Sequence, residues 1–155
     1  MTVRLPLTAA MPAQWAPAPE RPRLRRELDG VHILVIEDMD DTRDTTCEML
    51  EAVGADVVVT KDGLEALQTL STRAFDVVFC DLLMPRMDGY EFLKELQRRQ
   101  GATHPPVIAI SDLASSADHL QTQIAGFETH IDKPFDEMGL VAAVGAVMAR
   151  QRRPA

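Results

Sequence analysis

Residues 75–89 read FDVVFCDLLMPRMDG, an apolar run that ends in a carboxylate and is followed by turn residues. Val and Phe dominate residues 75–80, which favours a buried β-strand. Asp81 closes this run, and Pro85 and Gly89 mark a loop that leads into a helical pattern. Because an unpaired charge is costly to bury, Asp81 needs solvent, a cation or a chemical role. The rest of the chain has to supply its partner.

Further apolar runs have the same character as residues 75–80 and alternate with segments of helical spacing. They cover residues 31–37, 55–60, 106–111 and 128–131. Near-continuous apolar strands separated by helices are typical of a parallel sheet that is covered on both faces. The predicted fold is therefore α/β, a doubly wound five-stranded parallel sheet of (βα)5, flavodoxin-like architecture.

In such sheets, sites form beyond the carboxyl ends of the strands. The residues at these ends in this chain are polar or charged: Glu37, Asp38, Asp81, Ser111, Asp112 and Lys133, the last followed by Pro134. Taken singly, each is more often an ordinary loop carboxylate, hydroxyl or solvated lysine. Their joint placement at successive strand ends favours a single functional site.

Carboxylates held close together repel one another unless a cation compensates. Mg²⁺ prefers oxygen ligands, and Glu37, Asp38 and Asp81 offer an oxygen-only set. Lys133 adds a point charge that suits a phosphoryl group. An aspartate beside Mg²⁺ and a lysine can act as a nucleophile toward phosphorus, so an aspartyl phosphate is the predicted chemistry.

Composition narrows the class of protein further. The chain has 155 residues, which suits one domain, and a formal charge of -8, which argues against a nucleic-acid partner. Cys47 and Cys80 stand in apolar contexts outside any CxxC pattern, so we expect small core residues in a reducing compartment. No apolar run approaches the length of a membrane span. We expect a cytoplasmic location and no membrane contact.

The chain resembles the receiver domain of bacterial response regulators over about residues 30–150. The similarity lies in ILVIEDMDDTR, VVFCDLLMPRMDG, VIAIS and IDKPF, which occur in the family's order. The resemblance implies that Asp81 receives a phosphoryl group from a histidine kinase or a histidine phosphotransfer domain. It further implies that the isolated domain is not an enzyme, apart from catalysing its own phosphorylation and dephosphorylation.

The same resemblance implies roles for the other residues of the site. Glu37 and Asp38 are expected to hold Mg²⁺ together with Asp81 and the backbone carbonyl of Leu83. Lys133 is expected to contact the phosphoryl oxygens, with a cis bond to Pro134. Ser111 is the expected switch hydroxyl, and the switched surface comprises the fourth helix, fifth strand and fifth helix. Relatives often dimerise through these helices, so a second copy of this chain is a candidate partner.

Two positions depart from the family pattern. His130 stands where relatives usually carry Tyr or Phe, three residues before the lysine, and is either a switch side chain or a partly exposed polar residue on a short edge strand. Asp112 stands where relatives commonly carry a small residue. It either slows the approach of anionic phosphodonors or caps the helix that begins near Ser115. Met84 and Met87 are expected to pack the loop, and Asp88 to cap a helix.

The ends of the chain suggest a larger parent protein. Residues 2–7 resemble the last strand of a histidine kinase ATP-binding domain, residues 1–29 have linker composition, and residues 151–155 form a tail. We therefore expect the C-terminal receiver of a hybrid histidine kinase, with a stand-alone single-domain regulator as the alternative.

Three other functions fit the sequence less well. An aspartate-nucleophile phosphatase would carry a second acid two residues after Asp81, where Leu83 stands. A dinucleotide-binding domain would carry glycines after the first strand, which are missing. A non-phosphorylated adaptor would not need the acidic pair, Asp81, Ser111 and Lys133 together.

Overall fold

The computed structural model describes residues 26–112 and 116–152. The predictions for residues 2–7 and for most of the linker and the tail fall outside these ranges. Strands and α-helices alternate along the chain, with one short 3-10 helix before the fourth strand. They are β1 (His32–Ile36), α2 (Asp40–Ala52), β2 (Asp56–Thr60), α3 (Gly63–Thr72), β3 (Val77–Asp81), α4 (Gly89–Gln100), the short 3-10 helix η3 (Gly101–Thr103), β4 (Val107–Ser111), α5 (Ser116–Ala125), β5 (Thr129–Asp132) and α6 (Glu137–Arg152).

The strands form one parallel sheet in the order β2-β1-β3-β4-β5. The predicted five-stranded doubly wound sheet is confirmed. Strand bounds differ from the predicted ones by a residue or two, and α6 continues to Arg152, past the predicted domain end at residue 150. The reversal of strand order at β1 and β3 places the ends of these two strands at the switch point, where α/β sheets bind their ligands.

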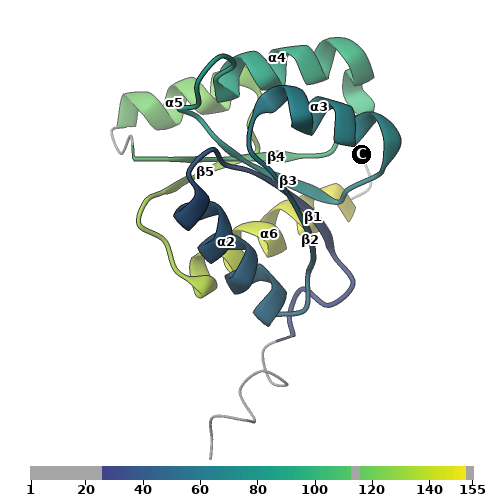
Figure 1. The fold of residues 1–155 in the computed structure, drawn as a ribbon, viewed down its shortest axis with the longest axis vertical. Helices are drawn as coiled ribbons and strands as arrows, with labels where there is room; N and C mark the ends of the chain where they lie inside the picture. Colours follow the sequence, from purple (N-terminus) through teal and green to yellow (C-terminus); the bar gives the residue numbers. More distant parts are fainter. Residues whose placement is uncertain (1–25, 113–115, 153–155) are drawn as a thin grey trace, which may run out of the picture.

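Helices cover both faces of the sheet (Figure 1). The α3–α4–α5 layer lies over one face, and α2 and α6 lie over the other. Alternate residues of β3 enter the two cores: Val78 and Cys80 join the first, and Val77 and Phe79 the second. This two-sided burial explains why β3 is apolar without interruption until Asp81.

The loop after β3 packs tightly against the end of its own strand. The Gly89 backbone N–H donates to the Leu82 carbonyl at 2.9 Å, and a Cβ on Gly89 would come within 2.9 Å of the Asp81 carbonyl oxygen. Asp88 then caps α4 in a reciprocal capping box with Glu91, as the sequence predicts. Met84 is buried and Met87 packs against the same core, which confirms their structural role.

The two cysteines differ in environment. Cys80 is buried in the core, but Cys47 on α2 is only half-buried, so the prediction that both are core residues is wrong for Cys47. Neither forms a disulfide. None of the helices in the described ranges has the length and apolar character that a membrane crossing would require.

Candidate functional site

The carboxyl ends of β1, β3 and β5 bring acidic and basic side chains together. Carboxylate oxygens of Glu37, Asp38 and Asp81 lie within 4.8 Å of one another. The Lys133 amine lies 3.2 Å from Glu37 Oε1 and 3.6 Å from Asp81 Oδ2. Glu37 and Asp81 are buried and Asp38 is half-buried. The structure thus assembles four of the predicted site residues from three separate strand ends.

Asp81 has an unusual electrostatic environment. Burial, and then the hydrogen bond and like charge of Glu37, raise the pKa of Asp81 to about 7, although Lys133 and the Leu83 N–H act in the opposite direction. That N–H lies 3.3 Å from Asp81 Oδ1. Burial acts to lower the pKa of Lys133, but the charges of Asp81 and Glu37 outweigh it and the pKa rises. The amine therefore carries its charge at neutral pH.

The acidic set fits a hard divalent cation. Its donors are oxygens only, and burial together with the adjoining Glu37 carboxylate raises the pKa of Asp81 to about 7. A divalent cation would remove that conflict, since it favours the ionised forms of all three acids. Leu83 lies in the same loop with an exposed side chain, and the role of its carbonyl stays a prediction.

Ser111 lies at the end of β4, next to the acidic set, and is almost completely buried. Its backbone carbonyl accepts a hydrogen bond from the backbone N–H of Lys133 at 2.9 Å. Ser111 also pairs with Asp132 in the sheet, so the backbone of Lys133 is held at the end of β5. The Lys133–Pro134 peptide bond is cis. Asp112 is exposed, and its predicted capping role involves residues 113–115, which lie outside the described ranges.

His130 is half-buried as a whole residue on the short edge strand β5, but its exposure comes from the backbone. Its side chain is 3% exposed, and its Nδ1 lies 3.2 Å from the hydroxyl of Thr122 on α5. The sequence reasoning also missed its neighbours His119 and Asp132. A signal for Asp132 existed, because residues two apart on a strand share a face, but the position of His119 depends on how α5 packs.

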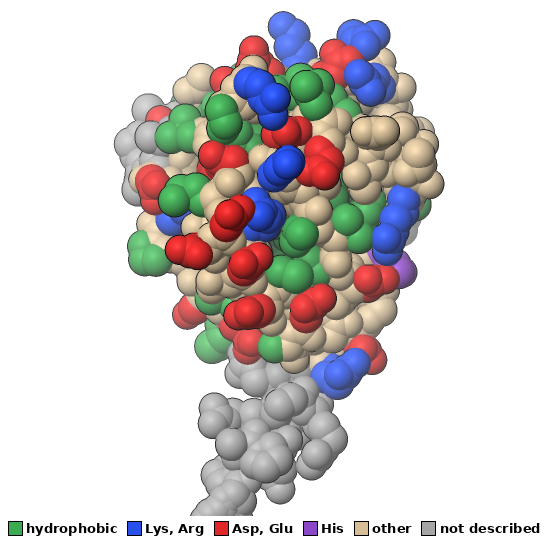
Figure 2. Space-filling view, in the orientation of Figure 1, with side chains coloured by type: hydrophobic (Ala, Val, Ile, Leu, Met, Phe, Trp, Pro, Cys, Tyr) green, Lys and Arg blue, Asp and Glu red, His purple; other side chains and the backbone are tan. Residues whose placement is uncertain are grey.

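The acidic side chains are unevenly distributed over the surface. Figure 2 shows acidic groups gathered over α2 in the lower half of the view. Their residues are exposed and surround a single basic neighbour on that helix, Arg43: Asp40, Asp41, Asp44, Glu48 and Glu51. This surface would repel an acidic partner and favour a basic one.

Comparison with known proteins assigns the family. The response regulator receiver domain matches residues 33–145, so this chain belongs to the receiver domains of two-component signalling. Protein PilG of Pseudomonas aeruginosa is 30% identical over 79% of this chain and 91% of its own length. The chain is also 33% identical to the transcriptional regulatory protein CseB of Streptomyces coelicolor, covering 51% of it, and to probable histidine kinase 2 of rice, covering 13%.

Solved receiver domains share the fold. The receiver domain of the Francisella response regulator 1452 superimposes with a TM-score of 0.73 at 30% identity, covering 79% of this chain and 100% of that one. The receiver domain of a Pseudomonas aeruginosa sensor histidine kinase superimposes with a TM-score of 0.71 at 25% identity, covering 77% and 98%. The latter was determined with a magnesium ion coordinated in its active-site cleft.

Proposed function

We propose that this receiver domain accepts a phosphoryl group on Asp81 from the phosphohistidine of a histidine kinase or a histidine phosphotransfer domain, in a reaction that depends on Mg²⁺. The observation that carries the proposal is the assembly of Asp81, two further acids and the Lys133 amine at one sheet edge. Membership of the receiver family and the magnesium ion of a similar receiver domain support it.

The side chains divide the work between nucleophile and charge stabilisation. An ionised Asp81 oxygen attacks phosphorus, the bond from phosphorus to the donor imidazole breaks, and that imidazole leaves with the bonding electrons. Lys133 would contact the incoming phosphoryl oxygens, because its amine lies 3.6 Å from Asp81 Oδ2. Bound Mg²⁺ would neutralise the charge that collects on the phosphoryl oxygens. Glu37, Asp38 and Asp81 are the side chains that would hold it.

The change of charge at Asp81 would drive the switch. A phosphoryl group adds about -1.5 to -2 charges and three strong acceptors. Lys133 would then move from Glu37 toward the new acceptors, and the Ser111 hydroxyl would turn to donate to them. His130 lies on the next strand, packed against α5, so a shift at Ser111 would reach the surface formed by α5, β5 and α6.

Phosphodonor labelling tests the proposal. Incubation of the full chain with a small phosphodonor and Mg²⁺ should add one base-labile phosphate, located on Asp81 by mass spectrometry. Asp81→Asn should abolish it, whereas Asp44→Asn, which alters an exposed acid of α2, should leave it unchanged. Labelling that persists in Asp81→Asn, or continuous turnover of the donor with no retained phosphate, would contradict the proposal. Continuous turnover would instead support a phosphatase.

The setting of the domain is a second part of the proposal. We propose that the domain is the C-terminal receiver of a hybrid histidine kinase. The sequence of residues 2–7 supports this origin, as does the rice histidine kinase, of which the matched region is a small part. The isolated domain would then catalyse only its own phosphorylation and dephosphorylation, in the cytoplasm. Sequencing the gene upstream of residue 1 tests the origin: an adjoining kinase domain supports it, and its absence supports the stand-alone regulator. Sedimentation with and without phosphodonor tests for a homodimer.

A further inference from the structure

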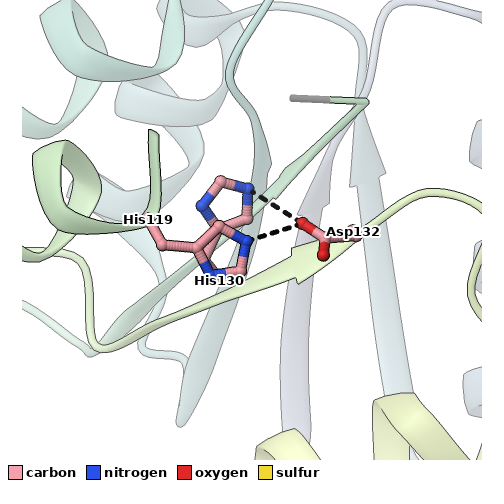
Figure 3. A group of neighbouring side chains, drawn as sticks. All are labelled: His119, His130 and Asp132. Carbon is pink, nitrogen blue, oxygen red and sulfur yellow. Dashed lines mark hydrogen bonds and ion pairs between the residues drawn. The ribbon is translucent and has the colours of Figure 1, made fainter. Parts of the chain in front are cut away.

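A second cluster of possible metal ligands lies away from the acidic set, between α5 and β5. Figure 3 shows the His119 and His130 rings stacked, with the Asp132 carboxylate to the right of both and facing a nitrogen of each. The ring centroids are 4.2 Å apart and the planes differ by 15°. Asp132 Oδ1 lies 2.8 Å from His119 Nε2 and 3.7 Å from His130 Nε2. The ligand atoms of the three residues lie within 4.8 Å of one another.

The hydrogen bonds of Thr122 indicate which nitrogen of His130 carries the proton. The Thr122 hydroxyl donates its one hydrogen to the His119 carbonyl at 2.8 Å. It can then only accept from His130 Nδ1, which lies 3.2 Å away, so this nitrogen carries a hydrogen. In a neutral imidazole, Nε2 is then the nitrogen with the free lone pair, which faces the carboxylate of Asp132.

This lone pair has no partner. His130 Nε2 is the only buried side-chain nitrogen or oxygen within residues 26–112 and 116–152 that lacks a hydrogen bond. A proton on it would be opposed by burial and then by the neighbouring His119, which together lower the pKa of His130 despite the charges of Asp132 and Asp118. A buried acceptor aimed at a carboxylate costs free energy unless something positive lies between them.

We propose that His119, His130 and Asp132 form a binding site for a divalent transition metal, with Zn²⁺ as the representative ion. Two imidazole nitrogens and one carboxylate oxygen are a common ligand set for zinc, with water as the fourth ligand. The Nδ1–H of His130 bonded to Thr122 supplies the outer hydrogen bond that metal-bound histidines usually make. Nitrogen ligands also distinguish this site from the oxygen-only acidic set.

Zinc binding requires the side chains of His119 and Asp132 to move, and both are exposed enough to do so. Tetrahedral zinc holds nitrogen and oxygen ligands about 3.3 Å apart, as its bond lengths of about 2.0–2.1 Å require. The present spread of up to 4.8 Å must therefore shrink. His119 and Asp132 are 41% and 43% exposed, so their side chains can rotate toward an ion that arrives from solvent. His130 is held by burial and by Thr122 and would be the fixed ligand.

Calorimetric titration of the full chain with Zn²⁺, in excess Mg²⁺ to occupy the acidic set, tests the site. One ion should bind per chain. His119→Ala should weaken binding by about 100-fold or more, as expected for loss of one of three protein ligands, and Thr122→Val by about tenfold, as expected for an outer hydrogen bond. The chain has four histidines, and the other two provide matched controls. His104→Ala and His32→Ala should leave the affinity unchanged.

The controls are chosen for their contacts. His32 faces Asp56 at 3.0 Å and reproduces a single histidine–carboxylate pair, while His104 Nδ1 lies 2.7 Å from a backbone carbonyl. Co²⁺ should give the visible absorption bands of a tetrahedral site, and His119→Ala should abolish them. Absence of Zn²⁺ binding, equal affinity in His119→Ala, or loss of binding in Asp38→Asn would overturn the proposal. None of these results depends on phosphorylation of Asp81, so each leaves the proposed function standing.

Discussion

Lys133 lies closer to Glu37 than to Asp81, with its amine 3.2 Å from Glu37 Oε1 and 3.6 Å from Asp81 Oδ2. One half-buried cation is therefore shared between two buried carboxylates and cannot offset the charge of both. The pKa of Asp81, raised to about 7 chiefly by burial and by Glu37, reflects this imbalance. The site without a cation is electrostatically incomplete, and its chemistry should respond strongly to any change in local charge.

Replacing the shared cation should slow phosphorylation. Lys133→Met removes the ammonium group that pairs with the carboxylates of Asp81 and Glu37, so Asp81 would hold its proton more tightly and the phosphoryl oxygens would lose a contact. We expect a fall of about tenfold or more in the rate of labelling by a small phosphodonor, equivalent to about 1.4 kcal/mol in activation free energy. Lys94→Met removes an exposed lysine on α4 and should not change the rate. Equal rates for both variants would contradict this role of Lys133.

The free energy of unfolding should depend on pH because Asp81 ionises near neutral pH. Its native pKa of about 7 exceeds the ordinary value of 3.8, so the native state binds the proton more tightly than the unfolded state does. Stability from this group is then fully present below about pH 4 and is lost as pH rises through about 7. Asp81→Asn removes the ionised carboxylate and should stabilise the chain at about pH 8 by on the order of 2–4 kcal/mol, with a smaller gain at about pH 5.

Urea unfolding at both pH values measures this difference. Excess Mg²⁺ should shrink the gain at the higher pH, because a cation bound to the acidic set stabilises the wild-type chain. A gain that is the same at both pH values and insensitive to Mg²⁺ would show that Asp81 does not ionise in this range.

The loop after β3 should tolerate no side chain at Gly89. A Cβ there would come within 2.9 Å of the Asp81 carbonyl oxygen and of Leu82 Cα, so the backbone that positions Asp81 would have to shift. We expect Gly89→Ala to destabilise the chain by about 1–3 kcal/mol and to reduce phosphodonor labelling. Gly145→Ala on α6 meets nothing within 4 Å and should stabilise by about 0.5–1 kcal/mol. Thermal unfolding compares the two, and similar effects would contradict the packing argument.

Asp112 should affect the donor rather than the fold. It is exposed beside the site, and its charge is one of those that raise the pKa of Lys133. Asp112→Asn should speed labelling by an anionic phosphodonor by about two- to fivefold at low salt, and the difference should shrink at high salt. A difference that does not depend on salt would point to a steric cause instead.

His130→Tyr should separate phosphorylation from its readout. The substitution leaves Glu37, Asp81 and Lys133 in place but removes the imidazole that contacts Thr122 on α5. We expect unchanged labelling of Asp81 and an altered affinity for a partner that reads the surface of α5, β5 and α6. Surface plasmon resonance with phosphorylated and unphosphorylated chain measures this. Equal partner affinity of both variants in both states would argue against a switch role.

The sequence predicts the fold well because the signal is repeated. Strands such as β3 are apolar from residue 77 to residue 80, as burial on both faces requires, and a polar residue follows. The convergence of Glu37, Asp38, Asp81 and Lys133 then follows from the rule that parallel strands end at one edge of the sheet.

The second cluster could not be predicted in the same way. Asp132 and His130 share a face of β5 by alternation, but His119 joins them only through the packing of α5. The tautomer of His130 depends on a hydroxyl from the same helix. The His130 side chain is also more buried than a short strand at the edge of the sheet suggests, because it packs against Thr122 of α5.

β5 is an edge strand that pairs only with β4. Its residues at the two proposed sites, from His130 to Lys133, are consecutive in the chain. Ile131 points into the core on the α2 and α6 side, His130 and Asp132 face α5, and Lys133 comes next in the chain. Any sliding or tilting of β5 would therefore move the His130 imidazole and the Lys133 ammonium group together. A metal ion bound by His130 and Asp132 would stiffen β5 and so restrict the displacement of Lys133.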